Sequence, residues 1–475
     1  MKARTVGVAS RTWHLMDAER QKSQQLAFTE ESRGESPKAA DEGIEASVAK
    51  REYESPAVEM ELMEEVCEGR NLTKALKRVE ANRGSAGVDG MRASELRGYL
   101  KDHWPRIRED LLSGSYKAQP VRRVEIPKEG GGVRQLGIPT VVERFIQQAL
   151  LQALSKLWEP TFSEHSYGFR PGRSSHQAVA QAQQCVAEGH RWVVDIDLEK
   201  FFDRVDHDRL MSRLASRVGD KRILRVVRGL LNAGVMENGL VSPTIAGTPQ
   251  GGPLSPLLSN IVLDELDREL ESRGHRFVRY ADDCNIYVRS ERAGHRVMKS
   301  VRRFITGRLK LKVNDDKSAV GRPWQRKFLG FSFTSGHKPK RRISPEALQR
   351  VRRRVRELTR RTRAVSLAQM AQELSTYLRG WRGYYGYCQT PSVLGELDSW
   401  IRRRLRNVVW KQWKRGRRRY AALRLFGVSR ALAVQTAGSS HGPWRLSRSP
   451  TLSYALPNAY FDTLGLPRLA RTNNA

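Results

Sequence analysis

Three acidic side chains interrupt segments that are otherwise apolar. Asp197 follows a Val- and Ile-rich run, while Asp282 and Asp283 lie between the apolar arms 277–278 and 286–288. A carboxylate among apolar residues is costly unless it is solvated, paired or coordinated. Turn chemistry alone explains a double-Asp turn, but a third carboxylate on a separate apolar strand favours a shared site.

Carboxylates of this kind can hold two Mg²⁺ ions, which prefer hard oxygen ligands. Such an ion pair supports in-line phosphoryl displacement, with one ion activating a primer 3′-hydroxyl and the other neutralising the triphosphate. Asp195 lies two positions before Asp197 and on the same face of the strand. Spacing alone therefore does not choose between Asp195 and Asp197.

The elements expected around these acids alternate between strands and helices without regular βαβ units. Apolar alternation predicts strands over 121–127, 133–138 and 192–198, and a hairpin over 277–288. Helical periodicity predicts helices from Thr140 to Pro160 and over 254–270. We therefore expect an α+β fold up to about residue 335 and mostly helix from there to about 430.

The charge of the chain is large and unevenly distributed. The 475 residues carry a formal net charge of +34, although positions 1–70 are net negative at −5. Lys338–Arg363 holds 12 basic and 2 acidic residues, and Trp400–Arg419 holds 10 basic and no acidic residues. Both runs alternate with apolar residues at helical spacing, which indicates helices with an Arg-rich face. Phosphates are the natural partners of such faces, so nucleic acid is expected, with RNA and DNA both open.

Several protein classes are disfavoured. No run of about 18 apolar residues is present, so no membrane partner is expected, and residues 1–23 contain no apolar signal core. The four cysteines are far apart and form no zinc motif. We expect a cytoplasmic protein.

Eight segments of the chain resemble, in order, the motifs of bacterial group II intron reverse transcriptases, also called maturases. Tyr280-Ala-Asp-Asp283 matches their YxDD signature. The other matching segments are RQLGIP at 134–139, YGFRPG at 167–172, DLEKFFD at 197–203, GTPQGGPLSP at 247–256, LKVN at 311–314, FLGF at 328–331 and RGWRGYY at 379–385. The chain is most similar to the class C enzymes, which lack an endonuclease domain.

The resemblance implies a right-hand polymerase architecture with fingers, a palm built on an antiparallel sheet with a catalytic hairpin, and a helical thumb. The implied domains are a flexible extension over 1–70, fingers and palm over 71–335, a thumb or maturase domain X over 336–425, and a small basic DNA-binding region over 426–475.

The resemblance also implies roles for single residues. Asp197, Asp282 and Asp283 would be the catalytic residues and the ligands of two Mg²⁺ ions. The residues expected to bind the dNTP are Lys128, Arg134, Phe202, Gln250 and Gly251, with Phe202 positioned to exclude a ribose 2′-hydroxyl. Those expected to contact nucleic acid are Arg170, Arg173, Arg352, Arg353, Arg403 and Arg404. Lys310, Lys312 and Lys317 are possible proton donors to pyrophosphate, and the sequence does not choose among them.

The function implied is an RNA-directed DNA polymerase, a nucleotidyltransferase encoded by a mobile group II intron. It would extend a DNA or RNA primer on an RNA template with dNTPs. It would also bind intron RNA to assist RNA splicing, and a DNA target. Two alternatives stay open: a splicing-only RNA-binding maturase, and a related reverse transcriptase recruited to phage defence, spacer acquisition or diversity generation.

Overall fold

The computed structural model describes residues 61–127, 132–237, 240–242, 247–248 and 251–470. The chain divides into two compact units, one over Phe28–Arg322 and one that includes Pro323–Ala475. The division falls ahead of the boundary expected at residue 335, so the FLGF segment belongs to the same unit as the C-terminal helices. The expected domain boundaries remain predictions.

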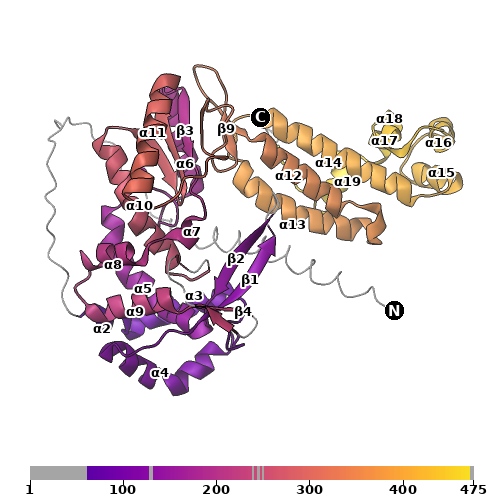
Figure 1. The fold of residues 1–475 in the computed structure, drawn as a ribbon. Coiled ribbons are helices and arrows are strands. Elements are labelled where there is room, and N and C mark those ends of the chain that lie inside the picture. The colour runs from indigo at the N-terminus through magenta and orange to yellow at the C-terminus, as the bar shows by residue number, and fades with distance from the viewer. Residues whose placement is uncertain (1–60, 128–131, 238–239, 243–246, 249–250, 471–475) are drawn as a thin grey trace, which may run out of the picture. The chain divides into compact units, whose positions relative to one another are not determined.

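The first unit is mixed α and β (Figure 1). Its helices are α2 (Leu62–Val66), α3 (Gly69–Asn82), α4 (Leu96–Ser113), α5 (Val141–Trp158), η1 (Glu159–Thr161), α6 (Ser175–Ala187), α7 (Phe201–Arg204), α8 (His207–Ala215), α9 (Lys221–Asn232), α10 (Ser255–Ser272) and α11 (Glu291–Gly307). Its strands are β1 (Val121–Pro127), β2 (Val133–Ile138), β3 (Trp192–Ile196), β4 (Val235–Glu237), β5 (Leu240–Ser242), β6 (Arg276–Tyr280), β7 (Asp283–Val288) and β8 (Ala319–Gly321).

Two four-stranded sheets organise this unit. The central sheet has the order β6-β7-β3-β8 and is antiparallel throughout. The other has the order β2-β1-β4-β5, in which only the β1–β4 pair is parallel. One continuous apolar core joins the helices to the central sheet, including Ile286 of β7 and Leu263 of α10. The central sheet is therefore packed against the helices through buried apolar side chains.

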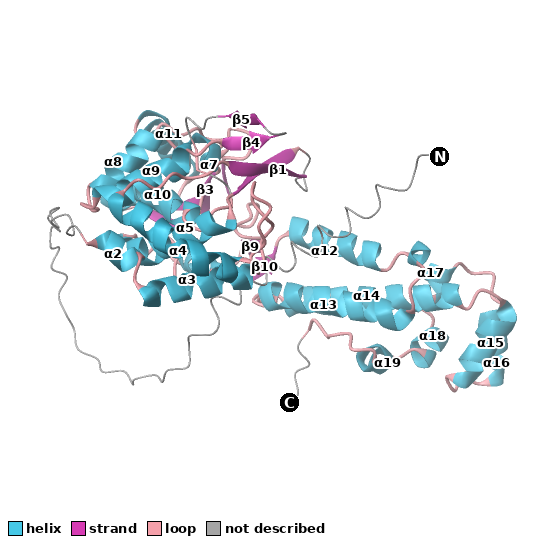
Figure 2. Cartoon of the chain, turned by 90° about the horizontal axis from the view of Figure 1, so that it is seen from below, coloured by secondary structure: helices cyan, strands magenta, loops and turns pink. Residues whose placement is uncertain are grey.

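The second unit is almost entirely helical in its described part (Figure 2). Its short strands β9 (Phe331–Phe333) and β10 (Arg341–Ile343) form an antiparallel pair. The helices are α12 (Pro345–Leu358), η2 (Arg361–Arg363), α13 (Leu367–Tyr385), α14 (Pro391–Gln412), α15 (Gly416–Leu425), α16 (Arg430–Ala437), α17 (Pro443–Leu446), α18 (Pro450–Ala455) and α19 (Asn458–Thr463). A separate apolar core holds α12, α13 and α14 together.

The expected fold class is confirmed: an α+β region precedes a helical region. Helical structure also continues past residue 430, where no element was predicted. Within the described part of the chain, every helix is too short or too polar to cross a bilayer.

Candidate active site

The acidic pair lies at the tip of a hairpin in the central sheet. Strands β6 and β7 pair antiparallel up to Tyr280 and Asp283, which leaves Ala281 and Asp282 as the two turn residues. Ala281 has a φ of 56°, in the left-handed region. A tight turn of this kind requires a positive φ that residues with a Cβ adopt at a cost.

The register of the sheet brings Asp197 to the same end. Strand β3 pairs with β7 antiparallel, and the last paired residues are Ile196 and Cys284. One further step along this register sets Asp197 opposite Asp283 and on the same face of the sheet, since facing residues of antiparallel strands point the same way. Residues that lie far apart in the sequence are therefore neighbours at one edge of the sheet.

Asp197 is held by its backbone and is accessible at its side chain. Its N–H donates to Ser318 Oγ at 3.0 Å, and its carbonyl accepts from the N–H of Asn314 at 2.8 Å. Its side chain is 36% exposed, and the Lys317 ammonium lies 3.3 Å from Oδ2. Lys312 instead pairs with Glu199 at 2.8 Å. Of the three candidate lysines, Lys317 is therefore the one whose ammonium contacts an expected metal ligand.

Asp195 has a different environment on the same strand. It is 9% exposed and faces Asn285 on one side and Ala319 on the other. Its carboxylate therefore lies within the packed sheet rather than at its edge.

The carboxylates of Asp197, Asp282 and Asp283 are suitable ligands for a divalent cation, because Mg²⁺ prefers carboxylate oxygens. In the described part of the chain, no three acidic, histidine or cysteine side chains are gathered closely enough to hold a metal ion by themselves. Mg²⁺ is usually bound by one or two carboxylates together with substrate phosphates and water. The arrangement therefore fits a site that the substrate completes.

Of the expected nucleotide-binding residues, the structure describes Phe202 and Gly251 in full. Phe202 is half-buried on α7, and its ring meets that of Phe201 edge to face with centroids 5.3 Å apart. Its carbonyl accepts from Thr248 N–H at 2.6 Å. Gly251 has a φ of 143°, and a Cβ there would lie 2.8 Å from the carbonyl oxygen of Gly137 on β2. Thr248 therefore contacts α7, and Gly251 closely approaches β2, where a residue with a Cβ would clash.

Three of the expected nucleotide contacts have no described side chain. Lys128 and Gln250 lie outside the described residues. The backbone of Arg134 pairs with Ile126 in the β1–β2 ladder. Their roles remain predictions.

Two further residues, which no sequence motif singled out, support these segments. His207, which is buried, places Nε2 2.6 Å from the Gly247 carbonyl oxygen and Nδ1 3.1 Å from Asn232 Oδ1. Arg279, on β6, is fully buried and contacts the Asp267 carboxylate with two nitrogens, at 2.7 and 2.5 Å. The signal that could have found Arg279 is a charged residue within the apolar arm of the hairpin.

The expected nucleic-acid contact of Arg170 is not supported by its surroundings. The residue is 4% exposed. Its guanidinium pairs with Glu159 at 2.8 Å and donates to the carbonyl oxygens of Ser163 and Ser166 at 2.5 and 2.9 Å. Because these acceptors enclose it, we assign Arg170 a structural role. Arg173 is half-buried beside it and donates to the Glu164 carbonyl at 2.7 Å.

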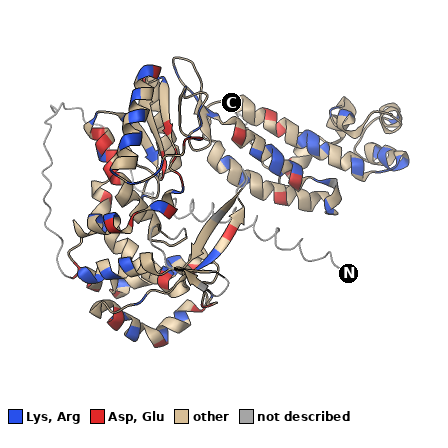
Figure 3. Ribbon diagram, in the orientation of Figure 1, with Lys and Arg blue, Asp and Glu red and all other residues tan. Residues whose placement is uncertain are grey.

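The remaining basic candidates lie on two helices of the second unit, where Lys and Arg are frequent (Figure 3). On α12, Arg353 is exposed and Arg352 is half-buried. On α14, Arg403 stacks over the Trp444 ring at 4.1 Å, and Arg404 donates to Thr359. The α14 pair is thus partly engaged in packing, and α12 offers the more exposed arginines.

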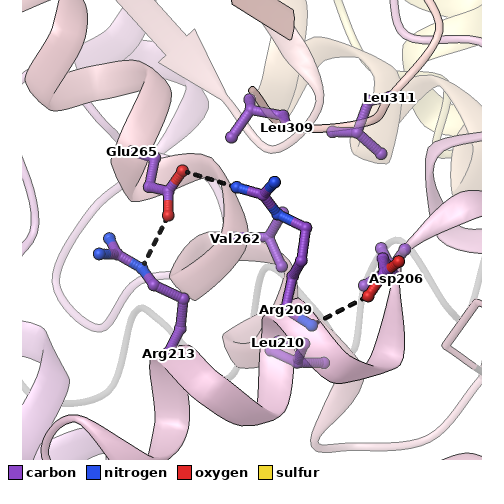
Figure 4. Close-up of a pocket in the computed structure, with 9 residues that line it drawn as sticks. Asp206, Arg209, Leu210, Arg213, Val262, Glu265, Leu309 and Leu311 are labelled. Atoms are coloured by element: carbon purple, nitrogen blue, oxygen red, sulfur yellow. Dashed lines mark hydrogen bonds and ion pairs between the residues drawn. The ribbon is translucent and has the colours of Figure 1, made fainter. Parts of the chain in front are cut away.

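A small cavity between α8 and α10 is too small for a nucleotide. Its volume is about 20 Å³, roughly the space of one water. Glu265 bridges Arg209 and Arg213 across its wall, with N···O distances of 3.4 and 3.3 Å (Figure 4). This cavity is not the substrate site.

Comparisons with known proteins agree with the motifs. The family described as reverse transcriptase (RNA-dependent DNA polymerase) matches residues 126–333, and the group II intron, maturase-specific domain matches residues 348–426. Protein YkfC of Escherichia coli is 35% identical over 272 residues, which cover 49% of this chain and 71% of YkfC.

Group II intron-encoded protein LtrA of Lactococcus lactis is 37% identical over 195 residues, covering 41% of this chain. The match spans only 32% of LtrA. A solved chain of a partial Cas6-RT-Cas1–Cas2 complex aligns with a TM-score of 0.34 and 25% identity, covering 52% of this chain and 42% of that one. That structural likeness is too loose to carry an argument.

Proposed function

The chain belongs to the family of group II intron reverse transcriptases and maturases, so its enzyme class is RNA-directed DNA polymerase, and we propose that it extends a primer on an RNA template with dNTPs. The observation that carries this proposal is the register of β3 against β7. That register sets Asp197 beside the hairpin tip that bears Asp282 and Asp283. Without this pairing, the three acids would have no common site.

In the proposed reaction, Asp197, Asp282 and Asp283 would hold two Mg²⁺ ions. Bound there, the ions supply Lewis-acid stabilisation of the attacking and leaving oxygens. Lys317 adds a positive charge beside Asp197, where it can neutralise or protonate the departing pyrophosphate.

The nucleotide would lie against Phe202 and the backbone near Gly251. A planar side chain at 202 would collide with a 2′-hydroxyl and so select dNTPs over NTPs. Lys128 and Arg134 would bind the triphosphate. Arg can contact it bidentately, whereas Lys contacts it as a point charge. Gln250 would line the same pocket.

The second unit would bind RNA and DNA. Its maturase-specific domain includes most of α12 and all of α13 and α14. Arg352, Arg353, Arg403 and Arg404 on α12 and α14 would contact phosphates of intron RNA and of the template–primer duplex. Assistance to splicing would then consist of binding. Residues 426–475 would contact a DNA target, and the proposed place of action is the cytoplasm.

The test is primer extension on an RNA template with dNTPs and Mg²⁺, using the full chain and the Asp282→Ala variant. We expect the full chain to make cDNA and the variant to make none while keeping most of its affinity for RNA. Extension by the variant would contradict the site assignment. RNA binding without extension by the full chain would favour the splicing-only alternative.

A further inference from the structure

Arg279 uses all of its hydrogen-bonding capacity directly beneath the hairpin tip. A guanidinium has five N–H donors, and here each meets an acceptor. The acceptors are the two carboxylate oxygens of Asp267 at 2.7 and 2.5 Å, Asn260 Oδ1 at 3.0 Å, Ser166 Oγ at 2.7 Å and the Ala281 carbonyl oxygen at 2.9 Å. The last of these is a backbone atom of the turn itself.

The two main partners of Arg279 come from one helix face. Asn260 and Asp267 are seven residues apart on α10, which places them on the same side of the helix. The Arg279 and Asp267 side chains are both 0% exposed. A buried ion pair is weak evidence for stability, because well-packed apolar residues often serve as well. What apolar residues could not replace is the directed contact to the Ala281 carbonyl.

A second contact supports the same turn. A Cβ at Gly168 would lie 2.2 Å from the Ala281 nitrogen, so the backbone there closely approaches the turn. Asn260 Nδ2 donates to the Gly168 carbonyl at 2.9 Å. Asn260 therefore connects Arg279 and Gly168, which contact Ala281 from two directions.

Ala281 needs such support. Its φ of 56° lies in the left-handed region, which disfavours any residue with a Cβ. The direction in which Asp282 points depends on this angle, since the two residues are adjacent in the turn. Relaxation of Ala281 to an ordinary φ would change the turn that carries Asp282.

We propose that Arg279, held by Asp267 and Asn260, is a positioning residue that keeps Ala281 in its left-handed conformation and thereby aims the tip carboxylates at Asp197. This inference rests on the proposed polymerase function and names a residue outside the YxDD signature that the reaction requires. Its effect is on the catalytic step, because Arg279 is enclosed by protein and does not reach the nucleotide.

The test compares Arg279→Lys, Ala281→Gly and the double variant in primer extension on an RNA template. Lysine keeps the charge and loses the fork that serves several acceptors. We expect kcat for dNTP addition to fall on the order of 10- to 100-fold, as a misplaced catalytic group would cause, with KM for dNTP little changed. Glycine adopts a positive φ freely, so the double variant should regain about tenfold in kcat over Arg279→Lys.

Arg402→Lys is the matched control. Arg402 is equally buried, with a side chain 2% exposed and paired with Asp398 and Asp462 at 2.7 and 2.9 Å, but it lies in the second unit. Its substitution should lower the thermal unfolding midpoint of the protein while kcat stays within about threefold. If Arg279→Lys fails to fold, Asn260→Ala replaces it in the test. This variant preserves the ion pair and should show a smaller loss of kcat.

Three results would overturn the inference. These are an unchanged kcat in folded Arg279→Lys, a lost kcat with no gain in the double variant, or unchanged hydrogen exchange of the amides of 281–283 in Arg279→Lys. The exchange measurement needs no activity. If the wild-type chain makes no cDNA, the polymerase proposal fails, while faster exchange confined to the tip would still support the positioning role.

Discussion

Lys317 lies with its ammonium 3.3 Å from the carboxylate of Asp197, at the edge of the central sheet. A positively charged side chain is therefore already in contact with this carboxylate, and the Asp197 side chain is 36% exposed. Asp195, on the same face of the same strand, is enclosed between β7 and β8 instead. This difference separates two acids that sequence spacing could not distinguish.

We predict that Asp197→Asn abolishes cDNA synthesis and that Asp195→Asn does not. Loss of a metal ligand removes several kcal/mol of transition-state stabilisation, which corresponds to a rate decrease on the order of 10³-fold. Asp195→Asn should keep kcat within about tenfold and mainly lower stability. Single-nucleotide extension assays on both variants decide the matter, and an inactive Asp195→Asn beside an active Asp197→Asn would reverse the assignment.

Much of the first unit could be predicted because local signals determine it. Thr140 was expected to begin a helix that stops before Pro160, and α5 runs from Val141 to Trp158 with Thr140 Oγ accepting from Glu143 N–H. The hairpin around Asp282 was likewise predicted from its two apolar arms. Capping and alternation act within a few residues of sequence, so they can be recognised without the fold.

The omissions concern side-chain contacts that a periodic sequence pattern does not encode, and helices too short to show such a pattern. Arg170 lies in a Gly- and Pro-containing segment that suggests an exposed turn, yet Glu159 pairs with it and carbonyl groups enclose it. The role of Arg279 depends on Asp267 and Asn260 from another helix. The helices after residue 430 are 4 to 8 residues long, too short for a periodic pattern to reveal.

We predict that Phe202→Ala raises ribonucleotide incorporation. The half-buried ring would no longer block a 2′-hydroxyl, and steric selection of this size is worth on the order of 10- to 100-fold. The measurement is the ratio of kcat/KM for a dNTP to that for the matching NTP. Phe201→Leu is the control, because Phe201 is buried next to it and should affect stability alone. An unchanged ratio in Phe202→Ala would refute the selective role.

Glu143 should make stability depend on pH. Burial raises the pKa of this carboxyl from 4.5 to about 7, although the Gln119 N–H donates to it. The folded state therefore holds a proton that the unfolded state releases near pH 4.5, so stability falls as pH rises from about 4.5 to 7 and levels off above that. Each pKa unit is worth about 1.4 kcal/mol, so the decline is on the order of a few kcal/mol.

We predict that Glu143→Gln removes this decline, because the amide does not ionise and its carbonyl can still accept from Gln119. Urea unfolding at pH 5 and pH 8 measures the effect, which should appear as a gain in relative stability of the variant at pH 8. The control is Glu109→Gln on the exposed side of α4. Equal pH dependence in wild type and Glu143→Gln would show that Glu143 is ionised in the folded protein at both values.

The basic helices should make RNA binding steeply dependent on salt. Each phosphate contact contributes a slope of roughly −0.7 to −0.9 to the plot of log K against log salt. The residues chosen to probe this surface are Arg353, which is exposed, and Arg352, which is half-buried, both on α12. We predict that Arg352→Gln with Arg353→Gln reduces the slope by about 1 to 2.

The control for this measurement is Arg97→Gln on α4, an arginine that already pairs with Glu80 at 3.0 Å. Its slope should match that of the wild type, because its charge is already partly neutralised by the carboxylate. Affinity for RNA would be measured by fluorescence anisotropy across a range of salt concentrations. A slope that is flat in the wild type, or unchanged in the α12 variant, would exclude this face of α12 from the RNA-binding surface.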